Sequence, residues 1–402
     1  AEDGTPVYFV VYLDPDGFVV VSGDDSVEPI IAFVECGEYD PSDEHPLGAL
    51  VSRDLPARVA DARGKVAAKA KTGQTADERY ALAQAKWDRL IEGAPAKGID
   101  YVSDVCVAPF IQTEWGQGAA SGVACYNYYT PPGPDGNAGN YVCGCVATAM
   151  AQLMRFYEHP TAGVGTGSFY IYVDGVGEMR PLRGGDGAGG PYDWANMVYT
   201  AGASTPEIQR QAIGALSYDA GLSVNMSYTD SGSATDTLEG ATAFVDTFGY
   251  SNAIKGYNNA SDIGPGLNGM TNPNLDAGRP VIFGIRRAGG GHAIVCDGYG
   301  YELDTLYHHL NMGWYGSSNA WYNLPEILSY ESVYKCIYNV YVTGSGEIIS
   351  GRVTTSDGSP VEGAEVVVEG SAAKTLLTTD EHGIFAIEKV ASNTEFAVSA
   401  SK

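Results

Sequence analysis

The sequence predicts an α+β protein in three parts, residues 1–96, 97–343 and 344–402. Three observations predict this fold class. Short runs of β-branched and aromatic residues open the chain and give way to an Ala-, Lys- and Glu-rich stretch, which indicates strands followed by helix. The middle of the chain is rich in Tyr, Gly and Asn, and the end alternates polar and apolar residues with a period of two. The length of 402 residues suits about two to four domains.

The chain is strongly acidic, because 49 Asp and Glu stand against 23 Lys and Arg, for a net charge of −26. Such a surface repels the phosphates of nucleic acid and of anionic membranes, so we expect neither as a partner. With 44% hydrophobic residues and 52 glycines, the composition excludes a disordered chain and a mainly helical one. No run of 18 apolar residues occurs, so no membrane insertion is expected.

The first part is predicted to contain an antiparallel meander and a helix. The candidate strands are residues 7–13, 17–22 and 29–34. Further on, Thr75 and Glu78 form a capping box, and apolar side chains then recur at helical spacing. Gly93 and Pro95 are expected to end this helix, within a linker at 93–100.

The remaining two parts differ in pattern. In the middle part, a helix is predicted to open at Cys145, and the clearest strand candidates are residues 281–286, 292–299 and 334–342. The period-two alternation of residues 344–402, interrupted by Asp-Gly and Pro turns, predicts a small β-sandwich. Asp357 and Asp380 lie in such turns, where a turn role is far more frequent than a calcium site, so no calcium is expected.

The seven cysteines are an odd number, so at least one thiol has no disulfide partner within the chain. Cys143, Gly144 and Cys145 form a C-x-C sequence, which differs from the C-x-x-C of thioredoxins. The six histidines are not spaced with the cysteines as a structural zinc site requires. We therefore expect no metal and no other cofactor.

Cys145 and His292 are the candidate nucleophile and base. Cys145 opens an apolar helix, and the free amides and dipole at a helix N-terminus stabilise a thiolate. His292 follows three glycines and begins an apolar strand, so the glycines leave room beside its imidazole. Taken alone, a cysteine is more often an inert core residue and a histidine a buried structural one. Nothing around His159, His308 and His309 opens a cleft, so they are poorer candidates.

Three further residues are candidates around this pair. Gln117 precedes the cysteine, and its amide is suited to stabilise an oxyanion, although a loop Gln without such a role is commoner. Asn311 and Trp314 follow the histidine and are candidates to orient and shield its ring, while Trp314 also suits a core position.

Four strings in this order resemble the streptopain (interpain) family of bacterial papain-like cysteine proteases. They are TEWGQ at 113–117, CVATAMAQ at 145–152, GGHAIVCDGY at 290–299 and NMGW at 311–314. The segment GFVVVSGDDSVEPIIAF at 17–33 is similar to the pro-domain of that family, so the resemblance covers residues 5–343. It implies a papain-like catalytic domain at 97–343 behind an inhibitory pro-domain at 1–96.

The resemblance also implies roles for single residues. Cys145 is then the nucleophile, His292 the base and then the acid, and Gln117 an oxyanion donor together with the Cys145 amide. Ser233 and Gly291 match positions whose backbones line the substrate cleft. The family further implies protein and peptide substrates with a hydrophobic side chain at P2 and no cofactor. It also implies a secreted or cell-surface bacterial setting after signal-peptide removal, with which the low content of 23 Lys and Arg agrees.

The chain departs from the family in one position, because Met312 stands where the family commonly has a Trp. This leaves open whether Asn311 or Trp314 orients the imidazole. The attached pro-domain implies a latent zymogen, with processing expected between about Lys86 and Tyr101. The last part is similar to transthyretin-like or carboxypeptidase-regulatory-like modules, which are immunoglobulin-like sandwiches.

Two alternatives stay open beside the protease. A binding or adhesion protein with an impaired papain-like scaffold is favoured by Met312 alone. A thiol acyltransferase such as a transglutaminase also uses Cys and His, but the four strings favour the protease.

Overall fold

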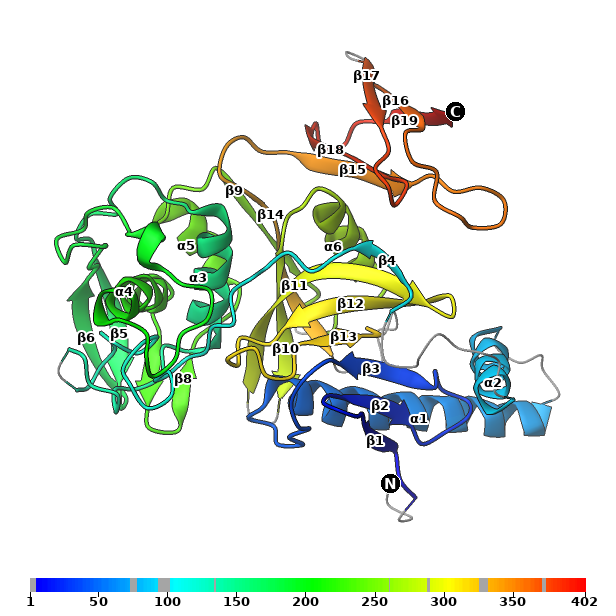
Figure 1. Cartoon of the computed structure of the whole chain (residues 1–402), viewed down its shortest axis with the longest axis horizontal. Coiled ribbons are helices and arrows are strands. Elements are labelled where there is room, and N and C mark those ends of the chain that lie inside the picture. The colour runs from blue at the N-terminus through cyan, green and yellow to red at the C-terminus, as the bar shows by residue number, and fades with distance from the viewer. Residues whose placement is uncertain are drawn as a thin grey trace.

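The computed structural model describes residues 5–72, 78–92, 102–133, 135–259, 261–287, 290–324, 332–370 and 374–402. The α-helices in this described part are α1 (Pro46–Thr72), α2 (Glu78–Ile91), α3 (Cys145–Tyr157), α4 (Glu207–Ser223), α5 (Glu239–Asp246) and α6 (Gly266–Asp276), with a short 3-10 helix at Trp194–Asn196. Together with the sheets they give the mixed α and β architecture that the sequence predicts (Figure 1). No helix among these residues is both long and apolar enough to cross a membrane.

A ten-stranded sheet forms the centre of the molecule, in the order β1-β2-β3-β13-β12-β11-β10-β14-β9, with β4 added against β11. Its strands are β1 (Tyr8–Tyr12), β2 (Phe18–Ser22), β3 (Ile30–Val34), β4 (Asp104–Val107), β9 (Asn252–Tyr257), β10 (Val281–Arg287), β11 (Gly290–Glu302), β12 (Thr305–Asn311), β13 (Ala320–Tyr322) and β14 (Val333–Tyr341). The predicted meander and the three predicted strands of the middle part are confirmed. The join lies at β3 and β13, where Val34 pairs with Ala320, so the N-terminal meander extends the sheet of the middle part.

Helices cover the two faces of this sheet, and successive residues of β11 point to opposite faces. Ala293 and Val295 belong to the core cluster of α3 and α4, whereas Ile294 and Cys296 belong to that of α1. A second, four-stranded sheet packs beside α4 and runs β6-β5-β7-β8. Its strands are β5 (Ser168–Val173), β6 (Val176–Pro181), β7 (Ser227–Thr229) and β8 (Gly232–Ala234). The α3 and α4 side therefore carries its own small lobe, on the left of Figure 1.

Helix α1 is absent from the elements that the sequence analysis predicts individually. Pro46 suits a first helical position, but Gly48 and Pro56 are unfavourable inside a helix, which hides it in the sequence. A Cβ on Gly48 would lie 2.3 Å from the Asp40 carbonyl oxygen, so the helix start packs closely on the preceding chain. Helix α2 occupies the predicted place. The capping residue Thr75, and the predicted stop and linker at 93–100 with Tyr101 after it, lie outside the described residues.

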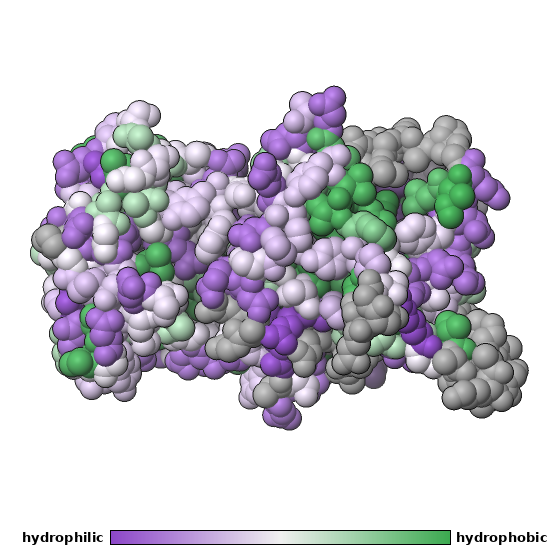
Figure 2. Space-filling model, turned by 90° about the horizontal axis from the view of Figure 1, so that it is seen from below, coloured by the Kyte–Doolittle hydropathy of each residue, from purple (hydrophilic) through white to green (hydrophobic). Residues whose placement is uncertain are grey.

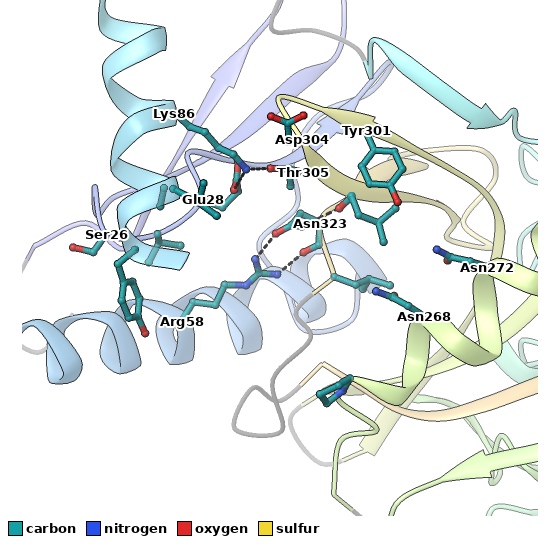
Figure 3. A pocket seen from close by; sticks show the side chains of 17 residues that line it. Ser26, Glu28, Arg58, Lys86, Asn268, Asn272, Tyr301, Asp304, Thr305 and Asn323 are labelled. Atoms are coloured by element: carbon teal, nitrogen blue, oxygen red, sulfur yellow. Dashed lines mark hydrogen bonds and ion pairs between the residues drawn. The ribbon is translucent and has the colours of Figure 1, made fainter. Parts of the chain in front are cut away.

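Two helices fasten the N-terminal part to the middle part (Figure 3). From α1, Arg58 holds Asp54 and donates to the Asn323 side chain at 2.7 Å and to its backbone carbonyl. From α2, the Lys86 ammonium pairs with Glu28 at 2.8 Å and contacts Thr305. These contacts lie at the edge of a cavity of 630 Å³ between the two parts, into which Asn residues of α6 also face.

The outer edge of the sheet is β1, at the bottom of Figure 1. It exposes Phe9, Val11 and Tyr12. The face seen from below is otherwise mixed, with local apolar patches among polar residues (Figure 2).

The C-terminal part forms two small facing sheets, as the sequence predicts. They are β15-β18 and β17-β16-β19, built from β15 (Glu347–Arg352), β16 (Glu365–Gly370), β17 (Lys374–Thr378), β18 (Ile384–Val390) and β19 (Phe396–Ser401). Their buried centre is small and consists of Val366, Val368 and Phe385. This module is docked on the middle part, because Arg352 holds both carboxylate oxygens of Asp104 at 2.7 Å.

Candidate active site

Cys145 is the first residue of α3, and its neighbours fix this position. Gly144, the residue before the helix, has φ +93°, a conformation that favours glycine. A Cβ at Gly144 would lie 3.0 Å from the Ser233 carbonyl oxygen. The helix is buried from Val146 to Met154, so it cannot shift easily. The half-buried Cys145 thiol therefore sits at a rigid helix N-terminus, where negative charge is favoured.

The other cysteine of the C-x-C sequence has a different environment. Cys143 is fully buried, and its sulfur lies 3.3 Å from the Thr148 hydroxyl. Burial raises the pKa of the Cys143 thiol to about 12. All seven cysteines are described and none forms a disulfide. Cys145 is thus the reactive candidate of the pair, and Cys143 a packing residue.

A cleft of 710 Å³ brings together six of the seven predicted site residues. The six are Cys145, His292, Gln117, Trp314, Ser233 and Gly291. His159, His308 and His309 do not line it. Burial lowers the pKa of His308 to about 3, and His309 pairs with Asp297 at 2.6 Å, which are structural environments. Among the described residues, no group of His, Cys, Asp and Glu is arranged to hold a metal ion.

The loop that carries Gln117 is held from two sides. The Gln117 carbonyl accepts a hydrogen bond from the Cys143 amide at 2.8 Å. The Gly118 amide donates to the Tyr315 hydroxyl at 3.0 Å. Tyr315 also packs so tightly on Gly116 that a Cβ there would lie 2.3 Å from its ring. Sequence reasoning missed Tyr315 as a site residue, although it directly follows Trp314 in the last motif.

His292 contacts the N-terminal part of the chain. Its Nε2 lies 3.0 Å from the backbone carbonyl oxygen of Asp43, so in this tautomer Nε2–H donates to that oxygen. The partner of His292 in the sheet is Ile285, which belongs to the core beneath α1. Asp43 precedes α1 by three residues. The imidazole is therefore engaged by the segment that leads into α1.

The same segment forms part of the wall of the cleft. Glu44 lies among the lining residues, and the His45 ring meets Trp314 edge to face with centroids 5.7 Å apart. His45 is buried, and its Nδ1 accepts a hydrogen bond from the Leu47 amide at the start of α1. Burial lowers the pKa of His45. Nothing in the sequence singled out this segment, since its role depends on a contact with a strand about 250 residues away.

Asn311 is the seventh predicted residue, and it lies outside the cleft lining. Its Nδ2 donates to the Thr113 carbonyl at 2.9 Å, and its Oδ1 accepts from the Gln152 side chain at 3.2 Å and from the Gly313 amide at 3.0 Å. These bonds join the loop before α3, α3 itself and the turn that carries Trp314. Asn311 thus holds the walls of the cleft in place.

Met312 lies in the core, away from the cleft. It is 1% exposed and belongs to the apolar cluster beneath α1. Trp314, two residues on, is the aromatic side chain that lines the cleft. Met312 is therefore a core residue, and Trp314 supplies an aromatic side chain to the cleft wall.

Comparison with known proteins gives two family matches. The peptidase C10 family matches residues 115–322, and the Spi protease inhibitor family matches residues 1–52. The thiol protease/hemagglutinin PrtT of Porphyromonas gingivalis is 28% identical over 321 residues, which are 76% of this chain and 32% of that protein. The chain thus spans about a third of the length of PrtT. Streptopain of Streptococcus pyogenes is 24% identical over 329 residues, or 79% of this chain and 74% of streptopain.

A solved structure shares the fold. A mutant prointerpain A fragment of Prevotella intermedia superposes with a TM-score of 0.58 at 20% sequence identity. The match covers 83% of this chain and 96% of that fragment.

Proposed function

Because the chain belongs to the peptidase C10 family, we propose that it is the zymogen of a secreted or cell-surface bacterial cysteine endopeptidase. The observation that carries the proposal is the cleft itself. Cys145, His292 and Gln117 line one cleft, and the N-terminal part contributes the Asp43 carbonyl that contacts His292 and Glu44 in the cleft lining. In this proposal the pro-domain comprises residues 1–96, the catalytic domain residues 97–343 and the sandwich module residues 344–402.

In the proposed reaction, the Cys145 thiolate attacks the scissile carbonyl carbon. The Gln117 side-chain amide and the Cys145 backbone amide stabilise the oxyanion of the tetrahedral intermediate. His292 protonates the leaving amine, which leaves an acyl group on the Cys145 sulfur. The neutral imidazole then removes a proton from water, and the resulting attack releases the acid and restores the thiol.

The remaining site residues are assigned supporting roles. Trp314 shields the imidazole, and Asn311 positions the turn that carries Trp314 through its bonds to Thr113 and Gln152. Ser233 and Gly291 are proposed to meet the substrate backbone. The Ser233 hydroxyl donates to the Val142 carbonyl at 2.6 Å, which fixes that wall of the cleft. The substrates proposed are proteins and peptides with a hydrophobic side chain at P2.

Latency follows from the contacts of the pro-domain. The Asp43 carbonyl accepts a hydrogen bond from His292 Nε2–H, so the pro-segment fixes the tautomer and the orientation of the imidazole. Glu44 lines the cleft and the His45 ring packs against Trp314, so the pro-segment forms part of the wall that a substrate would meet there. Cleavage between about Lys86 and Tyr101 is proposed to free the enzyme, with the pro-domain acting as an intramolecular inhibitor until then.

The alternative of an impaired binding or adhesion protein depends on Met312. Its place in the core, with Trp314 lining the cleft instead, removes that support.

The test is a time course of the purified chain in reducing buffer, followed by gel and N-terminal sequencing. The chain is expected to convert to a shorter form with a new N-terminus between residues 86 and 101. The Cys145→Ala variant and a thiol-directed epoxide are each expected to block conversion and peptide hydrolysis. Hydrolysis that persists in the Cys145→Ala variant would overturn the proposal, and a first cut elsewhere would overturn the boundary.

A further inference from the structure

One end of the cleft carries a positive charge that no assigned role uses. Arg286 on β10 pairs with Gly291 on β11, and both line the cleft together with Tyr334 of β14. Gly291 has no side chain, and a Cβ there would lie 2.7 Å from the Tyr334 hydroxyl. The Tyr334 hydroxyl thus lies against the proposed substrate-binding glycine, and Arg286 is the residue that pairs with this glycine across the sheet.

Contacts with Tyr334 and Asp262 help to fix the Arg286 side chain. Its guanidinium lies over the Tyr334 ring, 4.6 Å from the centroid. Its Nε donates to Asp262 Oδ1 at 3.0 Å, and Asp262 Oδ2 accepts the Ser332 amide at 3.1 Å. Asp262 is 5% exposed, whereas the Arg286 side chain is 27% exposed. A buried carboxylate and an aromatic ring therefore hold a guanidinium that still reaches the cleft, which is a preorganised arrangement.

The charges around the cleft make this cation unusual. The chain carries a net charge of −26, and the other charged residues among the described lining are the acids Glu44 and Asp230. Setting aside His292, Arg286 is the one basic side chain of that described lining. In the zymogen, an acid of the pro-segment, Glu44, lies in the same cleft. When the pro-domain leaves, Glu44 leaves with it and Arg286 stays.

We propose that Arg286 is a specificity-determining residue, which makes the cleft favour substrates with an Asp or Glu side chain at the position that passes Gly291. This rests on the proposed protease function and adds a charge requirement to the hydrophobic preference at P2. A guanidinium binds a carboxylate through paired hydrogen bonds, and a fixed guanidinium loses little side-chain freedom on binding. The Tyr334 hydroxyl beside Gly291 is suited to donate a further hydrogen bond to the same carboxylate.

The experiment measures cleavage preference with the processed wild-type protein. Its cleavage sites in a library of proteome-derived peptides identify the position with acidic enrichment. Two fluorogenic peptides are then made from the best site, identical except for Glu or Gln at that position. A hydrogen-bonded charge pair predicts a kcat/KM ratio of roughly 10 in favour of the Glu peptide.

Variants separate charge from structure. Arg286→Gln is expected to bring the Glu/Gln ratio close to 1, and Arg286→Lys, which keeps the charge and a donor, to keep an intermediate ratio. The matched control is Lys335→Gln, because Lys335 also lies over the Tyr334 ring and pairs with an aspartate but does not line the cleft. Its ratio is expected to equal that of the wild type. Where Arg286→Gln does not fold, as judged by its melting temperature, the Arg286→Lys ratio decides.

Two results would overturn the acid selection while leaving the protease intact. The first is a Glu/Gln ratio of kcat/KM near 1 for the wild type. The second is a Glu/Gln ratio that is the same in the wild type, Arg286→Gln and Arg286→Lys. A processed protein that cleaves no peptide and does not react with the epoxide at Cys145 would instead refute the proposed function, and the acid selection with it.

Discussion

The buried ion pair of α1 should be the strongest polar anchor of the N-terminal part. Arg58 donates to both carboxylate oxygens of Asp54, at 2.6 and 2.5 Å, and also to Asn323 across the interface. The side chains of Arg58 and Asp54 are 7% and 0% exposed. Replacing Arg58 by Met keeps the apolar stem but leaves Asp54 as a buried carboxylate with the Tyr322 hydroxyl, at 2.7 Å, as its remaining side-chain donor. Breaking a buried pair in this way costs about 3–5 kcal/mol.

The assay is urea unfolding of the full chain in a Cys145→Ala background, which prevents self-cleavage. The matched control is Lys65→Met on the same helix, because Lys65 pairs with Asp61 at 2.9 Å but is 43% exposed. An exposed pair of this kind is worth about 0.5 kcal/mol. Adding Asp54→Asn to Arg58→Met should recover part of the loss, since it removes the buried charge. The reasoning would be refuted if Arg58→Met lowered the free energy of unfolding no more than Lys65→Met does.

Two further predictions concern pH and the backbone at the nucleophile. Burial raises the pKa of Asp276 to about 6 from the ordinary value of 3.8, so the folded chain keeps a proton that the unfolded chain has released. The resulting gain in stability is present below the unfolded pKa, near pH 4, and is lost as the pH rises through about 6. The difference of about two units between the folded and unfolded pKa values corresponds to about 3 kcal/mol. Between pH 4 and pH 8 the free energy of unfolding of the wild type should therefore decrease by about 3 kcal/mol more than that of Asp276→Asn. An equal pH dependence of the two proteins would contradict this prediction. At Gly144, φ +93° and the nearby Ser233 carbonyl predict that Gly144→Ala loses about 1–3 kcal/mol and processes more slowly. Gly64→Ala, in an exposed helical position with open space around it, should gain about 0.5–1 kcal/mol, and equal effects at the two glycines would count against the strained turn.

Most of the strands and helices could be predicted from the sequence, because they depend on patterns among neighbouring residues. The runs of β-branched and aromatic residues at 7–13 and 17–22, and the apolar spacing after Cys145, are properties of neighbouring residues, so the strands and α3 could be predicted. Cys145, His292, Gln117 and Trp314 could be predicted because each lies in a distinctive string with glycines or aromatics around it, whereas Ser233 and Gly291 were expected from the family resemblance. Helix α1 could not be placed correctly, since Gly48 and Pro56 weaken its pattern and its stability comes from packing on β10.

Long-range pairings are the part that sequence patterns do not specify. The contact of Asp43 with His292 joins residues 249 positions apart, through a backbone carbonyl that any residue type has. The Arg286 guanidinium is held in place by Asp262 and Tyr334. These three residues come from three separate segments of the chain, so no local pattern brings them together. Asn311 lies in a recognisable motif, but its hydrogen bonds to Thr113 and Gln152 stabilise the walls of the cleft, and the sequence pattern does not specify these partners.

The measurement that tests the central claim most directly is the rate at which Cys145 reacts with a thiol-directed epoxide, mapped by mass spectrometry, before and after processing. Latency through Asp43 and Glu44 predicts slow labelling of Cys145 in the intact chain and labelling at least roughly tenfold faster once the pro-domain is removed, with Cys143 unlabelled in both because it is buried. Equal rates in the two forms would contradict the blocked cleft. A Cys145 that stays unreactive after removal of the pro-domain would contradict the cysteine protease itself.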